Sequence, residues 1–224
     1  MVGSNPINIS VDVVSDVVCP WCFIGKRRLE AALEKVAADG VAKSVAVRWH
    51  PFELNPDLPP EGIDRRAYLD AKFGGRERAA RLYERVRAAG ESDGIHFAFD
   101  RILRQPNTRD AHRLIAWAQR RGDANPLVER LFAAYFLEGR DPGERSELAA
   151  LAGEAGHDAA EVSAMLDSNE GRDEIVASER RAAKIGIGGV PFFIFNERLA
   201  VSGAQESRVL ADAIAESLNA PAIR

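Results

Sequence analysis

The sequence has only two cysteines among its 224 residues, and it lacks the second ligand pair that a zinc site needs. Structural zinc takes four ligands, usually as two closely spaced pairs of cysteine or histidine. The four histidines occur singly, at His50, His96, His112 and His157. No metal centre is therefore expected.

The chain also lacks a long apolar run and an excess of positive charge. No stretch is apolar for long enough to span a bilayer, and no signal peptide is recognisable at the start. The net charge of −4 gives no reason to expect nucleic acid or a membrane as a partner. Together these features predict a cytoplasmic protein.

The two cysteines form the motif Cys19-Pro20-Trp21-Cys22 between a β-branched segment and a segment with helical periodicity. Cys19 is thus expected at a helix start, where free N–H groups and the helix dipole favour an anion such as a thiolate. A thiolate is the nucleophile of disulfide exchange. A structural disulfide would close too short a ring to stabilise much, and Pro-Trp is not typical of core cysteines. The motif predicts a thiol–disulfide redox site.

The order of predicted elements indicates one domain with an insertion. Residues 1–51 predict a βαβ unit, and residues 170–224 predict helix, strand, strand and helix. Residues 52–169 are almost entirely helical in pattern, apart from a proline-rich opening and an extended or strand-like segment at 95–99. The predicted strands are Ile7–Val14, Val45–His50, Val190–Phe195 and Arg198–Ser202. The predicted helices are Trp21–Ala38, Ile63–Phe73, Arg76–Ala89, Thr108–Arg121, Pro126–Glu138, Arg145–Ala155, Ala159–Asp167, Gly171–Ile185 and Glu206–Leu218.

A second motif supports this organisation. Gly188-Gly189-Val190-Pro191 precedes an aromatic strand, where a proline is unusual because it cannot donate to the sheet. A cis Val190–Pro191 bond is one way to build the tight turn that this sequence needs. A Cys-x-x-Cys after the first strand and a Val-Pro before a later hairpin occur in the order of a thioredoxin fold.

Five segments of the chain resemble DsbA-type thioredoxin-fold oxidoreductases of the FrnE-like subfamily. They are residues 16–25, 49–56, 107–114, 189–193 and 202–205. The resemblance implies an α/β protein, a thioredoxin fold with a helical domain (52–169) inserted between the βαβ and ββα halves (1–51 and 170–224). Related branches are 2-hydroxychromene-2-carboxylate isomerase and kappa-class glutathione transferase, which usually carry serine where this chain has Cys19.

The expected mechanism uses Cys19 as the nucleophile and Cys22 as the thiol that resolves the mixed disulfide. Pro20 and Trp21 are expected to tune the pair. The resemblance implies that Pro191 packs against the cysteines and that the Val190 backbone pairs with substrate. Asp16 is either a loop carboxylate or a proton relay.

Other residues are placed around the expected cleft. The walls should include Trp21, Phe52 and the helix carrying Asn107 and His112, although His112 also fits a core or surface position. His50 should end the second strand. Ser202 and Gly203 form a turn that either binds an anionic carboxylate or caps the last helix.

Three functions remain open at this stage. The first is a cytoplasmic thiol–disulfide oxidoreductase or isomerase that acts on protein or low-molecular-weight disulfides and needs no cofactor. The second is a glutathione-dependent isomerase or transferase, with glutathione as co-substrate. The third is a binding protein for unfolded chains. A homodimer is one expected assembly.

Overall fold

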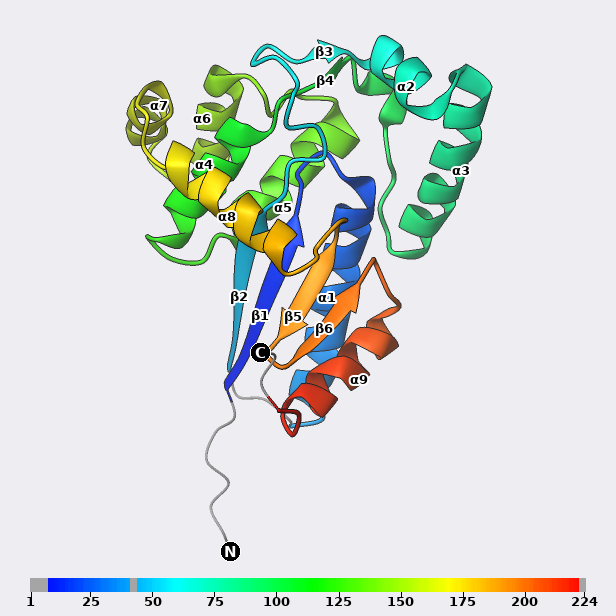
Figure 1. Ribbon diagram of the computed structural model, residues 1–224, viewed down its shortest axis with the longest axis vertical. Coiled ribbons are helices and arrows are strands. Elements are labelled where there is room, and N and C mark those ends of the chain that lie inside the picture. Colours follow the sequence, from blue (N-terminus) through cyan, green and yellow to red (C-terminus); the bar gives the residue numbers. More distant parts are fainter. Residues whose placement is uncertain (1–7, 41–43, 222–224) are drawn as a thin grey trace, which may run out of the picture.

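The computed structural model describes residues 8–40 and 44–221. Its centre is a four-stranded sheet in the order β2-β1-β5-β6 (Figure 1). The strands β1 and β2 are parallel, whereas β5 is antiparallel to both β1 and β6. Their bounds are Asn8–Ser15 (β1), Ser44–Pro51 (β2), Phe192–Phe195 (β5) and Leu199–Ser202 (β6).

The first strand pairs with the aromatic strand. Val11 lies opposite Phe195, and Val13 lies opposite Phe193. All four of these side chains are buried. The two halves therefore share one sheet and one core, as the order of motifs predicted. Ile7, the predicted first residue of this strand, lies outside the described residues.

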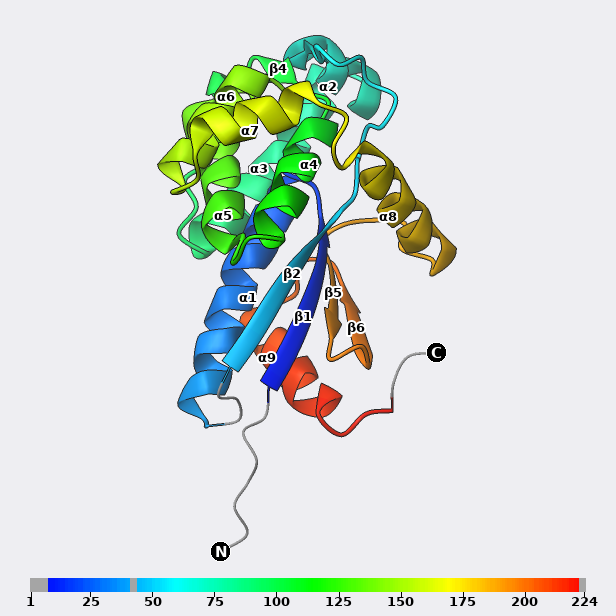
Figure 2. The same ribbon diagram turned by 90° about the vertical axis from the view of Figure 1, so that its left-hand side faces the viewer.

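Helices cover the two faces of the sheet unequally. The helices α1 (Pro20–Ala38) and α9 (Ser207–Ser217) pack against each other on one face. The helix α8 (Arg172–Lys184) crosses the opposite face near the end of β2 (Figure 2). Phe23 and Ile24 of α1 are completely buried. This burial anchors the start of α1 in the core, so the cysteines there are held in place.

The remaining helices stand above the end of the sheet at which β1 finishes (Figure 1). They are α2 (Arg65–Phe73), α3 (Arg76–Ser92), α4 (Arg109–Gln119), α5 (Asn125–Ala133), α6 (Arg145–Glu154) and α7 (Ala159–Asp167). This arrangement is the predicted thioredoxin fold with a helical insertion. Cys19 lies directly after β1 and therefore faces the insertion.

The predicted helix Ile63–Phe73 begins two residues later than expected. The Asp64 carboxylate accepts a hydrogen bond from the Ala67 N–H at 2.9 Å and caps the helix, so α2 begins at Arg65. Ile63 instead belongs to β3 (Ile63–Asp64), which pairs with β4 (Arg104–Gln105). This two-stranded sheet was not predicted, because such short strands leave no periodic pattern.

One alternative that the sequence left open is resolved, at 95–99, and two further segments differ from prediction. The segment 95–99 forms no strand in the structure; Phe97 and Phe99 stack on each other, and the Ala98 N–H donates to the Phe136 carbonyl. A short 3-10 helix follows at Phe99–Arg101. The predicted helix to Glu138 ends as an α-helix at Ala133 and continues as a π-helical turn, Ala134–Glu138. The strand predicted from Val190 begins at Phe192, because the preceding turn uses Val190 and Pro191.

Candidate active site

The start of α1 positions the two cysteines. Cys19 is the N-cap residue, with an extended backbone (φ −94°, ψ 111°), and Pro20 is the first helical residue. The Cys22 N–H donates to the Cys19 carbonyl at 3.0 Å, which closes the first turn. Both cysteines are free thiols. A thiolate at Cys19 would lie at this helix start, where the helix dipole favours an anion.

The turn before β5 lies against this helix. The Val190–Pro191 bond is cis, as the sequence suggested. The Cys19 Sγ lies 3.7 Å from the Val190 carbonyl oxygen. One turn after Cys22, a Cβ placed on Gly25 would lie 2.9 Å from the Pro191 Cγ. Glycine at position 25 therefore allows the proline to pack directly on the cysteine-bearing helix.

The two thiols differ in their surroundings. Cys22 is enclosed, with 1% of its surface exposed. Burial raises its pKa well above the usual value, and the neighbouring Cys19 raises it further. Contacts with the Ser15 hydroxyl and the Asp16 backbone oppose this shift without cancelling it. Cys22 is thus held as a neutral thiol inside the protein.

Cys19, although only 5% exposed, lines a pocket of about 410 Å³ between the sheet and the insertion. Trp21, which is 39% exposed, and Val190 line it from the thioredoxin side. Leu54 and residues of α2, α3 and β4 line the other side: Arg65, Tyr68, Lys72, Phe73, Leu82, Tyr83, Arg85, Val86 and Gln105. Cys22 does not line the pocket. A substrate that enters can therefore meet only one sulfur directly.

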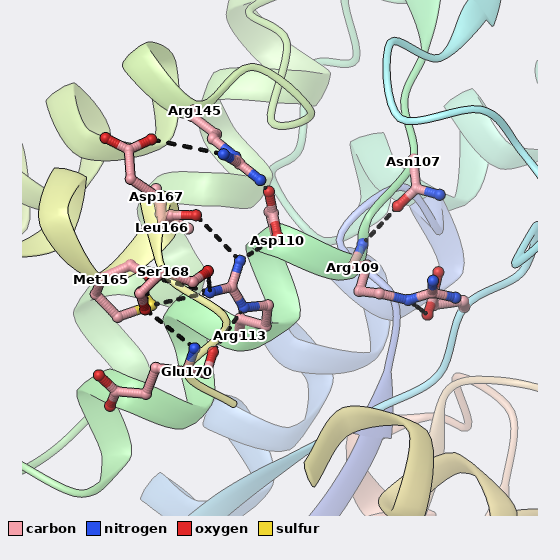
Figure 3. Close-up of polar contacts among 11 residues, drawn as sticks. Asn107, Arg109, Asp110, Arg113, Arg145, Met165, Leu166, Asp167, Ser168 and Glu170 are labelled. Carbon is pink, nitrogen blue, oxygen red and sulfur yellow. Dashed lines mark hydrogen bonds and ion pairs between the residues drawn. The ribbon is translucent and has the colours of Figure 1, made fainter. Parts of the chain in front are cut away.

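Three residues expected in the cleft wall lie elsewhere. Phe52 packs against Val14, Ala182 and Ile187 on the opposite side of the sheet. Asn107 donates to the Leu58 carbonyl at 2.8 Å. It also accepts from the Arg109 N–H at 3.0 Å (Figure 3). His112 is buried, which agrees with the core position that the sequence left open, and it does not line this pocket. The predicted wall is corrected accordingly, because α2 and α3, not α4, face the cysteines.

The helix α4 is instead fixed to the rest of the insertion. The Arg113 guanidinium contacts the Asp110 carboxylate and donates to the carbonyls of Met165, Leu166, Ser168 and Glu170 (Figure 3). These carbonyls lie at the end of α7 and just after it, where backbone oxygens lack helical partners. The segment resembling the family at 107–114 therefore contributes chiefly structural contacts.

The turn at Ser202 and Gly203 supports the proline turn. The Gly203 N–H donates to the Pro191 carbonyl at 2.8 Å, and Gly203 has a φ of 81°. The side-chain amide of Gln205 donates to the Ser202 carbonyl. Because the Gly203 N–H is already used, this turn is less suited to bind an anion than the sequence alone suggested.

A buried polar cluster lies below the cysteines. The Asp16 carboxylate accepts from the Leu54 N–H at 2.8 Å and lies 3.5 Å from the His112 Nε2. Glu53 pairs with Arg109 at 2.8 Å. Burial opposes the protonation of His112, but Asp16 and the nearby glutamates outweigh it and raise the His112 pKa. Sequence analysis singled out Asp16 and His112 but missed Glu53 and Arg109, which no motif marks.

His50 is the next-to-last residue of β2, which continues one residue beyond the predicted end to Pro51, and the His50 Nε2 lies 2.7 Å from the Asp12 carboxylate. This pair is on the sheet face that α8 crosses, away from the cysteines. In residues 8–40 and 44–221, no group of three or more acidic, histidine or cysteine side chains could hold a metal ion. Across the same residues, no helix is long and apolar enough to cross a bilayer.

Comparison with known proteins assigns the family. The model of the DSBA-like thioredoxin domain matches residues 10–215. The chain belongs to this family. The DSBA-like family consists of thiol oxidoreductases, in agreement with the resemblance found in the sequence.

Individual relatives of this DSBA-like protein cover nearly its whole length. The uncharacterized protein YwbO of Bacillus subtilis is 27% identical over 215 residues, which make up 94% of this chain and 98% of YwbO. The crystal structure of a probable DsbA oxidoreductase, SCO1869 from Streptomyces coelicolor, is 32% identical with a TM-score of 0.84, over 96% of this chain and 92% of that one. The cytosolic disulfide reductase DsbM from Pseudomonas aeruginosa, solved with GSH, shares the fold at 21% identity and a TM-score of 0.60, over 94% and 97% of the two chains.

Proposed function

We propose that the protein is a thiol–disulfide oxidoreductase that works through Cys19 and Cys22. The observation that carries the proposal is the contrast between the two thiols. Cys19 lines a pocket at a helix start, whereas Cys22 is enclosed and its pKa is raised. One sulfur is placed to attack a substrate, and the other is protected until a mixed disulfide forms.

The reaction follows from this geometry. The Cys19 thiolate attacks one sulfur of a disulfide, and the other half leaves as a thiolate with the electron pair of the broken bond. Cys22 then gives up its proton and attacks the Cys19 sulfur, which releases the second half. The substrate is reduced to two thiols and the cysteines are oxidised to a disulfide. The Val190 carbonyl, 3.7 Å from the Cys19 sulfur, lies where an extended substrate could pair with the backbone.

The remaining predictions belong to this proposal. Pro20, Trp21 and Val190 line the pocket with Cys19. Pro191 is expected to support the site through the turn that it shares with Val190, and Ser202 and Gly203 are expected to support that turn. Disulfide isomerase activity, a FrnE-like subfamily and a homodimer stay predictions. The cytoplasmic location is supported by the resemblance in fold to a reductase described as cytosolic.

Turnover of insulin or of a scrambled disulfide protein, with and without glutathione, tests the proposal. We expect Cys19→Ser to abolish activity and Cys22→Ser to accumulate mixed disulfides that mass spectrometry detects. Pro20→Ala is the matched control variant, because it changes the motif but keeps both thiols. Activity that survives the loss of Cys19 would overturn the mechanism.

A glutathione-dependent isomerase or transferase is the second candidate. It is favoured by the pocket beside Cys19, which at about 410 Å³ has the size of a small-molecule site. In that reaction Cys19 would hold or activate glutathione without cycling with Cys22. Full turnover of the Cys22→Ser variant would support this second function over the first.

A further inference from the structure

Arg65 is a buried cation without a carboxylate partner. Three arginine or lysine side chains are buried in the described part of the chain: Lys26, Arg65 and Arg113. Lys26 pairs with Glu129 at 2.7 Å, and Arg113 pairs with Asp110 at 2.5 Å. Across residues 8–40 and 44–221 no carboxylate lies within ion-pair distance of Arg65, whose exposed fraction is 5%.

Neutral groups surround this guanidinium. It donates to the Gln105 side-chain oxygen and to the Tyr83 hydroxyl. The rings of Tyr68, Tyr83 and Tyr135 lie 5.4 to 6.0 Å from its central carbon. Such contacts offset part of the cost of burying a charge, but a buried ion is normally paired with an opposite one. Because a guanidinium has five N–H donors, several remain for a further acceptor.

The pocket that Arg65 shares with Cys19 has a positive lining. Lys72 and Arg85, both exposed, are the other charged residues along it, and no aspartate or glutamate in the described chain lines it. Arg65 also borders a second hollow, here called the outer hollow, where Asp64, Asp70 and Asp100 outnumber the cations Arg65 and Arg66. An anion is therefore attracted to the cysteine side and repelled on the other.

Tyr83 adds a hydrogen-bond donor to the same wall. Burial raises its pKa, which the nearby Arg65 only partly offsets, so the phenol stays neutral. Its oxygen accepts from Arg65, and its hydroxyl hydrogen is left to donate to a ligand. Tyr83 and Cys19 line the same pocket.

We propose that this pocket binds a small thiol or disulfide that carries a carboxylate, and that Arg65 receives the carboxylate while the ligand sulfur meets Cys19. The inference rests on the proposed function and narrows its substrate class. Planar guanidinium and carboxylate groups form paired, charge-assisted hydrogen bonds. Lys72 and Arg85 at the rim would raise the local concentration of such an anion.

Three disulfides of matched length are compared, so that the effect of ligand charge is separated from the intrinsic reactivity of each disulfide. They are 3,3′-dithiodipropionate (anionic), 2-hydroxyethyl disulfide (neutral) and cystamine (cationic). Pre-reduced protein is mixed with each one, and the rate of protein-thiol loss is divided by the rate for dithiothreitol with the same disulfide. No external reductant is needed, because a single turnover oxidises the Cys19–Cys22 pair as each disulfide is reduced to two thiols. We expect the normalised rate for the anion to exceed that for the cation by about tenfold or more.

Variants assign this preference to the pocket. Arg65→Gln should remove most of the anion-to-cation ratio, and the double variant Lys72→Gln, Arg85→Gln should lower it severalfold. The double variant keeps the test valid if Arg65→Gln does not fold. The matched controls are Arg66→Gln, beside Arg65 but on the outer hollow, and the double variant Arg78→Gln, Arg81→Gln on α3. A ratio near one in the unaltered protein, or one that is insensitive to both pocket variants, overturns the inference.

A binding measurement separates the two levels of the proposal. In the Cys19→Ser, Cys22→Ser protein no exchange can occur, so calorimetry with 3,3′-dithiodipropionate reports binding alone. We expect Arg65→Gln, added to this protein, to raise the dissociation constant about tenfold or more. Arg66→Gln, added instead, should leave the dissociation constant unchanged. Undetectable binding overturns the anion site even if Cys19 is redox-active. Binding without any Cys19-dependent thiol loss keeps the anion site and overturns the proposed oxidoreductase function.

Discussion

The imidazole Nε2 of His112 lies 3.5 Å from the Asp16 carboxylate, and both side chains are closed off from solvent. Asp16 directly follows β1 and begins the turn that leads to Cys19, whereas His112 belongs to α4 of the insertion. The contact therefore joins the two parts of the fold directly below the redox motif. A charged His112 compensates the Asp16 carboxylate across this junction.

This contact predicts a stability that depends on pH. Burial lowers the His112 pKa, but Asp16, Glu53 and Glu179 reverse the effect, and the folded-state pKa is raised overall. A raised histidine pKa stabilises the protein fully below the unfolded-state value of about 6.5, and this contribution is lost as pH rises through the folded-state pKa. The free energy of unfolding, measured by urea titration from about pH 6 upward, should fall over this range.

Two variants assign the pH effect. His112→Gln should cost about 1–3 kcal/mol at pH 6, since it leaves buried carboxylates without their cation, and should flatten the decline at higher pH. His96→Gln, at an exposed histidine in the loop after α3, should leave the decline intact. If the His112→Gln protein keeps the decline of the unaltered chain, another group is responsible.

Gly25 is predicted to be essential for the packing of the proline turn. An alanine Cβ would lie 2.9 Å from the Pro191 Cγ and 3.1 Å from the Phe193 ring. Gly25→Ala should therefore destabilise the protein by about 1–3 kcal/mol through overpacking. Thermal unfolding checks this. Gly153→Ala is the matched control, since Gly153 also lies in a helix but its nearest neighbour would be 3.6 Å from the new Cβ. That control should stabilise by about 0.5–1 kcal/mol.

The parts of the site that lie close together in the sequence were predictable. Cys19 and Cys22 share one helix turn, and Val190-Pro191 is marked by the glycines before it and the aromatic strand after it. The strand order was predictable from these two motifs, because a thioredoxin fold places both motifs at one end of the sheet. The positions of glycine and proline and the spacing of apolar residues carry this information, and no distant contact has to be known.

The opposite wall of the pocket was not predictable in the same way. Arg65 and Tyr83 stand in helices whose sequence is amphipathic and charged, and nothing local distinguishes Arg65 from the exposed Arg66. Which one is buried depends on Gln105, forty positions later, in a strand of two residues. Asn107 was expected in the cleft, but its side-chain amide donates a hydrogen bond to the Leu58 carbonyl. Tertiary packing determines which of these side chains are buried and which line the pocket.

The exposed edge of the sheet offers another prediction. The side chain of Gln119, at the end of α4, accepts from the Trp49 N–H at 2.5 Å and donates to the Trp49 carbonyl at 2.9 Å. The Gln119 side chain thus makes the hydrogen bonds with the Trp49 backbone that a neighbouring strand would otherwise make. Gln119→Glu keeps the acceptor but loses the donor, whereas Gln119→Ala loses both. Chemical denaturation should show a cost of about 1–3 kcal/mol for alanine. Equal stability of Gln119→Ala and the unaltered protein would contradict a role at this edge.

The final prediction concerns the order in which the thiols react. Only a thiolate is alkylated at an appreciable rate, and the raised pKa of Cys22 together with its 1% exposure should leave it slow. With substoichiometric iodoacetamide near neutral pH, peptide mapping should find the label on Cys19. Cys22 in the Cys19→Ser protein should react at least about tenfold more slowly than Cys19 in the Cys22→Ser protein, since each unit of pKa changes the thiolate fraction about tenfold. In concentrated urea the two rates should converge, because the difference arises from the folded environment. Faster labelling of Cys22 in the folded protein would reverse the roles assigned to the two sulfurs.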